Sequence, residues 1–253
     1  MVKSTTALLI SRAATKSSSA FVSHASLSNN EVCTFLSRSY QRETRVLQTV
    51  DSRLYFSQES SPPVEEEVDP GKVEGTDLRI MKYPHPSLRA ENDEISEEEL
   101  KSGEISKIAK EMFLVMYAAA GVGLAAPQVG VNKRLMVYNP SGDKKKWLEE
   151  TVMVNPKIVE FGEGKDVEIE GCLSFPDMNG DVERSKWIKV EAMSLKGKKI
   201  KKKFKGWEAR IFQHEYDHLE GKVYIDRLSE QGRTEVQPVL DKLIENFGEG
   251  PAL

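Results

Sequence analysis

The chain has 253 residues, a formal net charge of −4 and 39% hydrophobic residues. This charge excludes an overall basic field of the kind that favours DNA binding. The two cysteines, Cys33 and Cys172, lie far apart in the sequence, which excludes a small secreted scaffold held by disulfides.

The first 50 residues differ from the rest of the chain in composition. They contain 16 Ser or Thr and six Lys or Arg, but only two acids. A segment that is rich in serine, bears arginine and is poor in acids is typical of organelle transit peptides. We therefore expect a transit peptide over residues 1–57 and import into an organelle matrix, with a disordered tail as the alternative. Residues 53–57 resemble a mitochondrial processing site, which favours the mitochondrion slightly over the plastid (chloroplast stroma).

The segments on either side of the predicted folded part are short. Residues 58–76 contain prolines and a run of acids, so we expect a solvated linker there. The folded domain is predicted over residues 77–247. Residues 248–253 are predicted to form a tail.

The folded domain is predicted to open with an extended segment over 79–86, because each of its prolines restricts the residue before it. Ser96 and Glu99 have the spacing of a capping box, which predicts a short helical turn. Apolar residues at helical spacing predict a core helix over 105–116. Residues 112–132 carry no charge, but their glycines and proline are unsuited to a membrane-spanning helix, so no membrane partner is expected.

Alternating apolar and β-branched residues predict three strands, at 134–138, 151–154 and 187–193. The lysine-rich segment 198–205 is expected to pair with the third of them as a hairpin that turns at Gly197.

Two further helices are predicted near the end of the chain. The first spans 209–219 and is closed by Gly221. Ser229 and Pro238 bracket a last amphipathic helix that continues through Ile244. Strands and helices that do not alternate regularly indicate the α+β class.

The clearest chemical signal is a pair of histidines in the first of these helices. His214 and His218 are four residues apart, so their imidazoles project from one face and can hold one metal ion. Glu215 lies where its carboxylate can reach a metal-bound water. Two surface histidines without a ligand are the alternative. Asp217 is expected to point away from the pair, either supporting a ligand or facing solvent.

A catalytic metal site needs a third protein ligand. No histidine follows His218, and the acids Glu230, Glu235 and Glu245 lie in the predicted last helix. Upstream, Cys172 follows a glutamate and a glycine, which is an unusual setting for a buried, purely structural cysteine. The thiolate of Cys172 is therefore the candidate third ligand.

Residues 121–128 form a third candidate block. Their small side chains would let a substrate backbone approach closely, and the amide of Gln128 could donate to a developing oxyanion. A nucleotide-binding loop is excluded, because the strand–glycine–helix order and the third glycine are missing. A tight loop with a structural glutamine remains the alternative.

Read together, three blocks resemble peptide deformylase, in its type 1B-like organellar form. They are Gly-x-Gly-Leu-Ala-Ala-Pro-Gln at 121–128, Glu-Gly-Cys-Leu-Ser at 170–174 and Gln-His-Glu-x-Asp-His at 213–218, in that order and without a substitution. Residues 83–89 also resemble the entry segment of the family. The resemblance covers about 78–228 and implies antiparallel or mixed sheets around a central metal-binding helix, with an N-terminal and a C-terminal helix.

The resemblance implies a metal-dependent hydrolase that removes the N-formyl group from the starting methionine of new chains and releases formate. Cys172, His214 and His218 would hold the metal, which lowers the pKa of a bound water. Glu215 would accept the proton of that water and pass it to the leaving amine. The amide of Gln128 and the backbone N–H of Leu173 would stabilise the oxyanion.

The resemblance also implies residues that bind the peptide. Their backbone groups would hold it as an added strand, and Ile211 would contribute to the pocket for the methionine side chain. These substrate-binding candidates are Val122, Gly123, Glu170, Gly171 and Ile211.

The cofactor implied by the resemblance is one divalent metal ion, with Fe(II) favoured and Zn(II) as the alternative. The implied partners are nascent N-formylmethionyl peptides. Contact with an organellar ribosome near the exit tunnel is a further candidate, through the seven lysines between Lys196 and Lys205. A solvated edge hairpin is the favoured interpretation of these lysines.

Two functions of other classes remain open at this point. A metallopeptidase would use the same helix but needs a carboxylate or histidine in place of Cys172 as its third ligand. A metal-stabilised binding domain without catalysis would not need Glu215.

Overall fold

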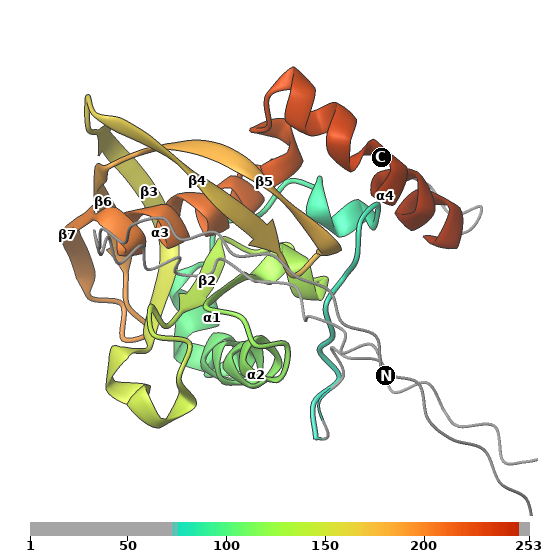
Figure 1. Cartoon of the computed structure of the whole chain (residues 1–253). Helices are drawn as coiled ribbons and strands as arrows, with labels where there is room; N and C mark the ends of the chain where they lie inside the picture. Colours follow the sequence, from blue (N-terminus) through green and yellow to red (C-terminus); the bar gives the residue numbers. More distant parts are fainter. Residues whose placement is uncertain (1–72, 74, 248–253) are drawn as a thin grey trace, which may run out of the picture. The chain divides into compact units, whose positions relative to one another are not determined.

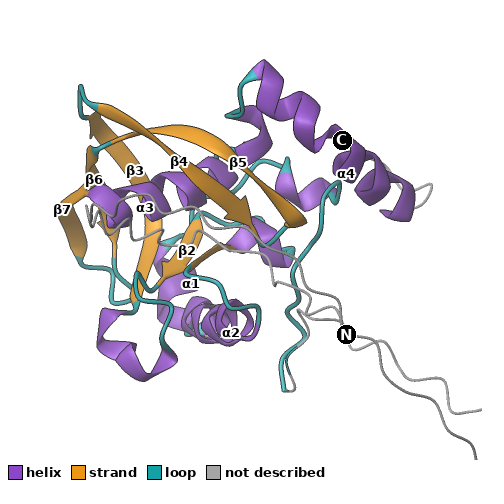
Figure 2. Ribbon diagram, in the orientation of Figure 1, coloured by secondary structure: helices purple, strands orange, loops and turns teal. Residues whose placement is uncertain are grey.

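The computed structural model describes residue 73 and residues 75–247. The predicted transit peptide (1–57), most of the predicted linker (58–76) and the predicted tail (248–253) lie outside the described residues. Figures 1 and 2 show the arrangement of helices and strands. None of the described helices is long and apolar enough to cross a membrane.

The strands form two antiparallel sheets. The larger sheet has the order β1-β2-β3-β6-β7, and β4 pairs with β5 in a separate two-stranded sheet. The strands are β1 (Gly123–Ala125), β2 (Leu135–Tyr138), β3 (Thr151–Phe161), β4 (Lys165–Cys172), β5 (Phe175–Ser185), β6 (Trp187–Met193) and β7 (Lys199–Lys205).

The α-helices are α1 (Glu97–Ser102), α2 (Glu104–Ala118), α3 (Gly206–Leu219) and α4 (Glu230–Phe247). Local features of the sequence mark the start of α1 and the end of α3. The capping box that starts α1 is present, since Ser96 Oγ accepts from the Glu99 N–H and the Glu99 carboxylate accepts from the Ser96 N–H. At the end of α3, Gly221 has φ 65°, a left-handed conformation that favours glycine.

The two sides of the larger sheet are covered by different helices. Leu124 of β1 and Val137 of β2 pack with the buried side of α2, which includes Met112 and Met116. The residues of β1 and β2 that point to the other side of the sheet, Ala125, Met136 and Tyr138, pack against α3. Ile188 and Val190 of β6 and Phe204 of β7 pack there as well. Helix α3 also contacts β5, so it lies between the two sheets (Figure 1). The predicted α+β class, with antiparallel sheets around the metal-binding helix, is confirmed.

The β4–β5 hairpin and the short strand β1 were not predicted from the sequence. Strand β4 turns its apolar residues outward, with Val167 and Ile169 59% and 58% exposed, while Glu170 is buried. This is the reverse of the usual amphipathic pattern, and it hides the strand. Strand β1 occupies part of the block that was interpreted as a loop, and Gly123 pairs there with Tyr138 of β2.

Helix α4 contains Pro238 in its interior rather than in its first turn, where a proline is best tolerated. Proline removes one backbone hydrogen bond there. The helix is held instead by packing, because Val236 and Leu240 are buried against Phe175, Val182 and their neighbours.

Candidate metal centre

Helix α3 brings the two histidines of the motif together in the protein interior. His214 and His218 are 3% and 1% exposed, and their ring centroids are 5.3 Å apart. Gln213 and Asp217, which are also four residues apart, project about a quarter turn away from the histidines, on an adjacent face of α3. The two imidazoles are therefore not surface residues, which removes one alternative left by the sequence.

Cys172, the last residue of β4, completes a group of three donors. Its Sγ atom is 3.3 Å from Nε2 of His218, and the donor atoms of Cys172, His214 and His218 all lie within 4.8 Å of one another. Bonds of about 2.0 Å to nitrogen and 2.3 Å to sulfur in a tetrahedral site place donors roughly 3.3 to 3.6 Å apart. The group therefore fits a single divalent metal ion.

The surroundings of the two histidines set the orientation of one ring and the proton affinity of both. Nδ1 of His214 donates to Oε2 of Glu170 at 2.9 Å, which leaves its Nε2 for the metal. Burial lowers the pKa of His218, and the neighbouring His214 lowers it further, so His218 is neutral. Burial opposes a charge on His214, but hydrogen bonds to Cys172 and Glu170 outweigh it and raise the pKa of His214, so a metal at its Nε2 would have to displace a proton.

Glu170 acts in this structure through its side chain as well as its backbone. Its carboxylate is fully buried and accepts from Arg184 at 3.0 and 2.9 Å and from Arg210 at 2.8 Å. Burial opposes its ionisation, but the hydrogen bond from His214 and the charge and hydrogen bonds of Arg184 keep the pKa of Glu170 well below its usual value. The sequence motif predicted only a backbone role here, and neither arginine carried a signal in the sequence.

Arg184 of β5 also joins the hairpin to α3. Its Nη1 atom donates to Oδ2 of Asp217 at 2.5 Å, and Asp217 accepts from Arg227 as well. The sequence left open whether Asp217 supports a metal ligand or faces solvent. In the structure, Asp217 is buried and points away from the donors. It fixes the face of α3 that lies behind the histidines.

Glu215, Gln128 and Leu173 all line a small cavity beside the donors. Burial raises the pKa of Glu215 to about 7, and its Oε2 has no hydrogen-bond partner among the described residues. The Gln128 amide nitrogen lies 3.4 Å from Sγ of Cys172, and its oxygen accepts from the Ala125 N–H at 2.8 Å. A buried acid without a partner and an oriented amide therefore face the same space.

The cavity has a volume of about 10 Å³, which is about the space that one water molecule needs. The cavity is small because its walls pack closely together. At Gly121, for example, a Cβ would lie 2.9 Å from the Leu173 side chain. At Gly123 a Cβ would lie 2.4 Å from Oε1 of Glu215, so only glycine fits there. The lining residues are Gly121, Val122, Gly123, Gln128, Gly171, Cys172, Leu173, His214 and Glu215.

Two strand edges border this cavity. Val122 and Gly123 lie at β1, an outer strand of the larger sheet, and Gly171 lies in β4, which pairs only with β5 among the described strands. Ile211, by contrast, is fully buried in the cluster between α3 and the larger sheet and is not among the described residues that line the cavity. Its predicted contact with a methionine side chain stays a prediction.

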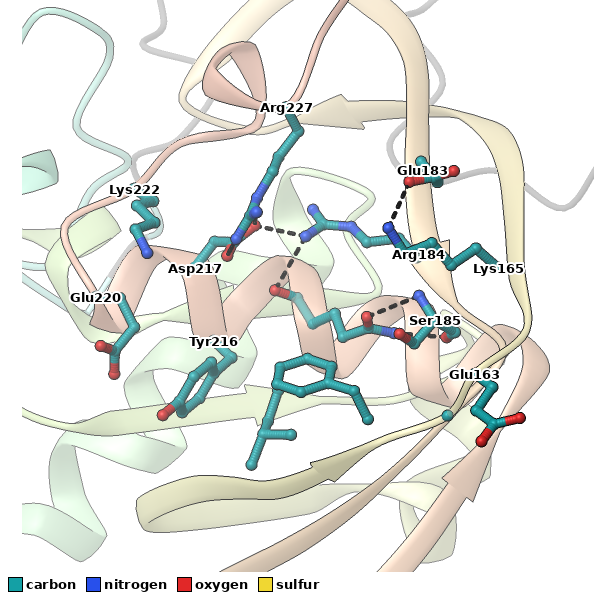
Figure 3. A pocket seen from close by; sticks show the side chains of 14 residues that line it. Glu163, Lys165, Glu183, Arg184, Ser185, Tyr216, Asp217, Glu220, Lys222 and Arg227 are labelled. Atoms are coloured by element: carbon teal, nitrogen blue, oxygen red, sulfur yellow. Dashed lines mark hydrogen bonds and ion pairs between the residues drawn. The ribbon is translucent and has the colours of Figure 1, made fainter.

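A larger cavity of about 500 Å³ borders another face of α3 (Figure 3). Tyr216, Asp217 and Glu220 project into it from the helix, and Arg184 and Arg227 meet Asp217 at its wall. Its charged groups are largely paired with one another, and the three metal donors are not among its lining residues. The candidate chemistry therefore belongs to the smaller cavity.

Comparisons with known proteins agree with this geometry. The family model for polypeptide deformylase matches residues 77–234. Peptide deformylase 1B, chloroplastic, from Oryza sativa subsp. japonica is 43% identical over 178 residues, which cover 70% of this chain and 64% of that protein. Peptide deformylase 1B, chloroplastic/mitochondrial, from Arabidopsis thaliana is 41% identical over 180 residues, with the same coverage. The chain thus spans about 64% of the length of these two relatives.

The fold is also similar to solved structures. A crystal structure of peptide deformylase from Plasmodium falciparum superposes with a TM-score of 0.65 at 38% sequence identity. The match covers 68% of this chain and 100% of that chain.

Proposed function

The chain belongs to the polypeptide deformylase family, and from that premise we propose that it removes the N-formyl group from the N-terminal formylmethionine of newly synthesised proteins. The products are formate and a free amino terminus. The observation that carries the proposal is the convergence of Cys172, His214 and His218 beside Glu215, whose carboxylate oxygen Oε2 has no hydrogen-bond partner among the described residues.

Cys172, His214 and His218 would hold one divalent cation, for which we propose Fe(II), with Zn(II) as the alternative. One thiolate and two imidazoles suit either ion. When bound, the cation lowers the pKa of a water molecule and polarises a carbonyl oxygen. The Glu170 carboxylate supports this arrangement because it fixes the His214 ring through Nδ1.

Glu215 is the proposed general base and acid. It would accept a proton from the attacking water and return it to the departing amine. Its burial, its free Oε2 and its place in the lining of the cavity support this role. The binding-domain interpretation gives no reason for a buried acid without a partner at this position.

Gln128 and the backbone N–H of Leu173 are the proposed donors to the oxyanion that forms on the formyl carbon. The amide orientation of Gln128 supports its part, because the Ala125 N–H fixes the oxygen and leaves the nitrogen toward the cavity.

The substrate would bind as an extra strand between β1 and β4. The free edges of these strands at Val122, Gly123 and Gly171 support this mode, together with the backbone of Glu170. A metallopeptidase is the poorer interpretation, since its third ligand would be a carboxylate or histidine, and Cys172 occupies that position.

We also propose that the protein works in an organelle. The composition of residues 1–57 supports import, and the names of the relatives from rice and Arabidopsis include the chloroplast. Those names favour the plastid over the mitochondrion that residues 53–57 favoured slightly. Imaging of the full chain and of a chain without residues 1–57, each fused to a fluorescent protein, tests both the import and the organelle. Contact with the ribosome near its exit tunnel stays a prediction.

The decisive experiment measures formate release from a formyl-Met peptide by the anaerobically purified full chain, with the unformylated peptide as control. Glu215→Gln should lower kcat by about 10²- to 10⁴-fold while metal content stays unchanged. The matched control is Glu220→Gln at the exposed residue that follows the last residue of α3, which should retain full activity. Normal turnover by Glu215→Gln would refute the mechanism.

A second variant tests the ligand set. Cys172→Ala should lose both metal and formate release, because two imidazoles leave the site incomplete. Full metal occupancy in this variant would favour the metallopeptidase instead.

A further inference from the structure

Within the part of the chain that the structure describes, no helix covers one face of the larger sheet at β6 and β7. Helix α2 covers this face over β1 and β2, where Leu124 and Val137 are buried. On β6 and β7 the same face carries exposed charged residues and one half-buried tryptophan. We call this surface the lysine face, and it consists of Trp187, Lys189 and Glu191 of β6 and Lys199, Lys201, Lys203 and Lys205 of β7.

The lysines of β7 are arranged in a row. They occupy alternate positions of the strand, so their side chains leave the sheet on one side. A strand rises about 3.3 Å per residue, which spaces them roughly 6.6 Å apart. The spacing is comparable with that of successive phosphates along an extended nucleic-acid strand. The row contrasts with the chain as a whole, whose net charge is −4.

Most charges of this row are not neutralised locally. Lys201 pairs with Glu191 at 2.7 Å. Lys199, Lys203 and Lys205 have no carboxylate within ion-pair distance among the residues that the structure describes. Such a row favours a polyanionic partner.

Trp187 adds an aromatic surface within the row. Nζ of Lys203 lies 3.4 Å from the centroid of its ring, and Nζ of Lys189 lies 5.8 Å away. The indole is fixed from another side by Gly162, where a Cβ would lie 2.6 Å from its Nε1. A nucleobase could replace Lys203 over this ring, and the released ammonium group would then reach a phosphate.

We propose that the lysine face binds a single-stranded segment of RNA. The lysines of β7 contact its phosphates, and Trp187 stacks on one base. Lysines that only protected the edge strand from pairing would not need a shared face or an aromatic neighbour. The choice of RNA rests on the proposed function, because newly made formylated chains emerge beside RNA. The test below measures binding separately from formate release, so the two can fail independently.

The test is fluorescence anisotropy of a labelled 20-nucleotide single-stranded RNA titrated with the full chain. The triple variant Lys199→Gln, Lys203→Gln and Lys205→Gln should bind at least about tenfold more weakly at low salt. The slope of log K against log salt should fall by about 2, since about 0.7 counterions are released per single-strand contact.

The matched control replaces three other exposed lysines by glutamine, Lys110, Lys222 and Lys242, which carry no described ion pair and lie on other elements. It should retain the binding and salt dependence of the wild type. Formate release should be normal in both triple variants, which also shows that they are folded. An equal loss of RNA binding in the control, or no binding by the wild type, would overturn the proposal.

Trp187 tests the stacking. Trp187→Leu should weaken binding about fivefold or more, whereas Trp187→Phe should bind almost normally because it keeps an aromatic surface. Unchanged binding by Trp187→Leu would contradict the proposal. So would tighter binding to double-stranded RNA of the same length, or to vesicles containing anionic lipid, at the same ionic strength.

Discussion

The hairpins β4–β5 and β6–β7 both contain many charged residues at alternate positions, but they direct them differently. In the first, Glu170 and Arg184 are buried and satisfied by each other and by α3. In the second, the lysines of β7 face outward, and the apolar residues of β6 form the core. Because charged residues alternate in both hairpins, the element that packs against each hairpin decides whether its charges are buried or exposed.

The partner of the first hairpin is Arg210 of α3. Its guanidinium contacts Asp166, Glu168 and Glu170, three acids at alternate positions of β4. The second hairpin packs against Phe212 and Ala209 of the same helix, which are apolar. One helix therefore receives an ionic sheet on one side and an apolar sheet on the other.

The largest expected effect is the difference in stability between replacing a buried acid and replacing an exposed acid of β4. Glu170→Ala should lower the free energy of unfolding of the metal-free protein by about 3 to 5 kcal/mol, because it leaves two buried arginines without their carboxylate. Glu168→Ala should cost less than about 1 kcal/mol, because its contact with Arg210 is exposed. Urea unfolding measures both, and equal losses would contradict the comparison.

A milder substitution of Glu170 tests its contribution to metal binding. Glu170→Gln keeps the shape of the side chain but weakens the hydrogen bond that orients His214. Metal affinity should fall about 10- to 100-fold, as is usual for partners of metal-binding histidines. Competition with a chelator measures this, and the corresponding Glu168→Gln variant should bind metal like the wild type.

A half-buried pair should give an intermediate effect. Arg89 and Asp226 form an ion pair with side chains 27% and 31% exposed. Burial raises the pKa of Asp226, but the Arg89 hydrogen bond and its other partners outweigh this and lower it. The pair therefore stabilises the fold above about pH 4, the usual value for an aspartate, and this contribution is lost as the pH falls through the lowered pKa.

The measurement is unfolding at pH 6 and pH 3. Asp226→Asn should lose about 1 kcal/mol at pH 6 and less at pH 3, because the carboxylate of the unfolded chain, with its usual pKa near 4, is then largely protonated and the ion pair contributes less to stability. A loss that grows toward low pH would show that the sign is wrong.

The smallest effect is expected on the second hairpin. Lys201 and Glu191 form an exposed pair with side chains 75% and 47% exposed. Neutralising both should leave the urea midpoint of unfolding unchanged, since solvent screens exposed pairs. A double-mutant cycle by urea unfolding measures the coupling, and a clear shift of the midpoint that depends on both residues would show that this hairpin also depends on its charges.

Much of the fold follows from local patterns in the sequence, while the ionic hairpin does not. Apolar spacing predicted α2 and α3, and alternation predicted β6 and β7. Strand β4 was missed because Val167 and Ile169 face outward while acids face the interior. Nothing near Arg184 in the sequence indicates that it is buried, since its partners lie 14 and 33 residues away.

The candidate site was predicted more completely than the fold around it. Cys172, His214 and His218 were assigned before the structure, and their donor atoms do converge. The side-chain role of Glu170 was missed, because a motif records which residues occur but not which of their atoms are used. For Gly123 the motif gave the residue but not the reason for it. Only the structure shows that a side chain there would collide with the Glu215 carboxylate.

The bridge formed by Arg184 has a mechanical consequence. His214 and His218 belong to one rigid helical turn, so their mutual separation is set by α3, whereas the sulfur of Cys172 belongs to a different element. Arg184 joins Glu170 of β4 to Asp217 of α3, and this tether fixes the distance between strand and helix. The two sides of the donor triangle that meet at the sulfur thus depend on the position of the strand, and their lengths are governed by the guanidinium group of Arg184, which bonds to none of the three donors.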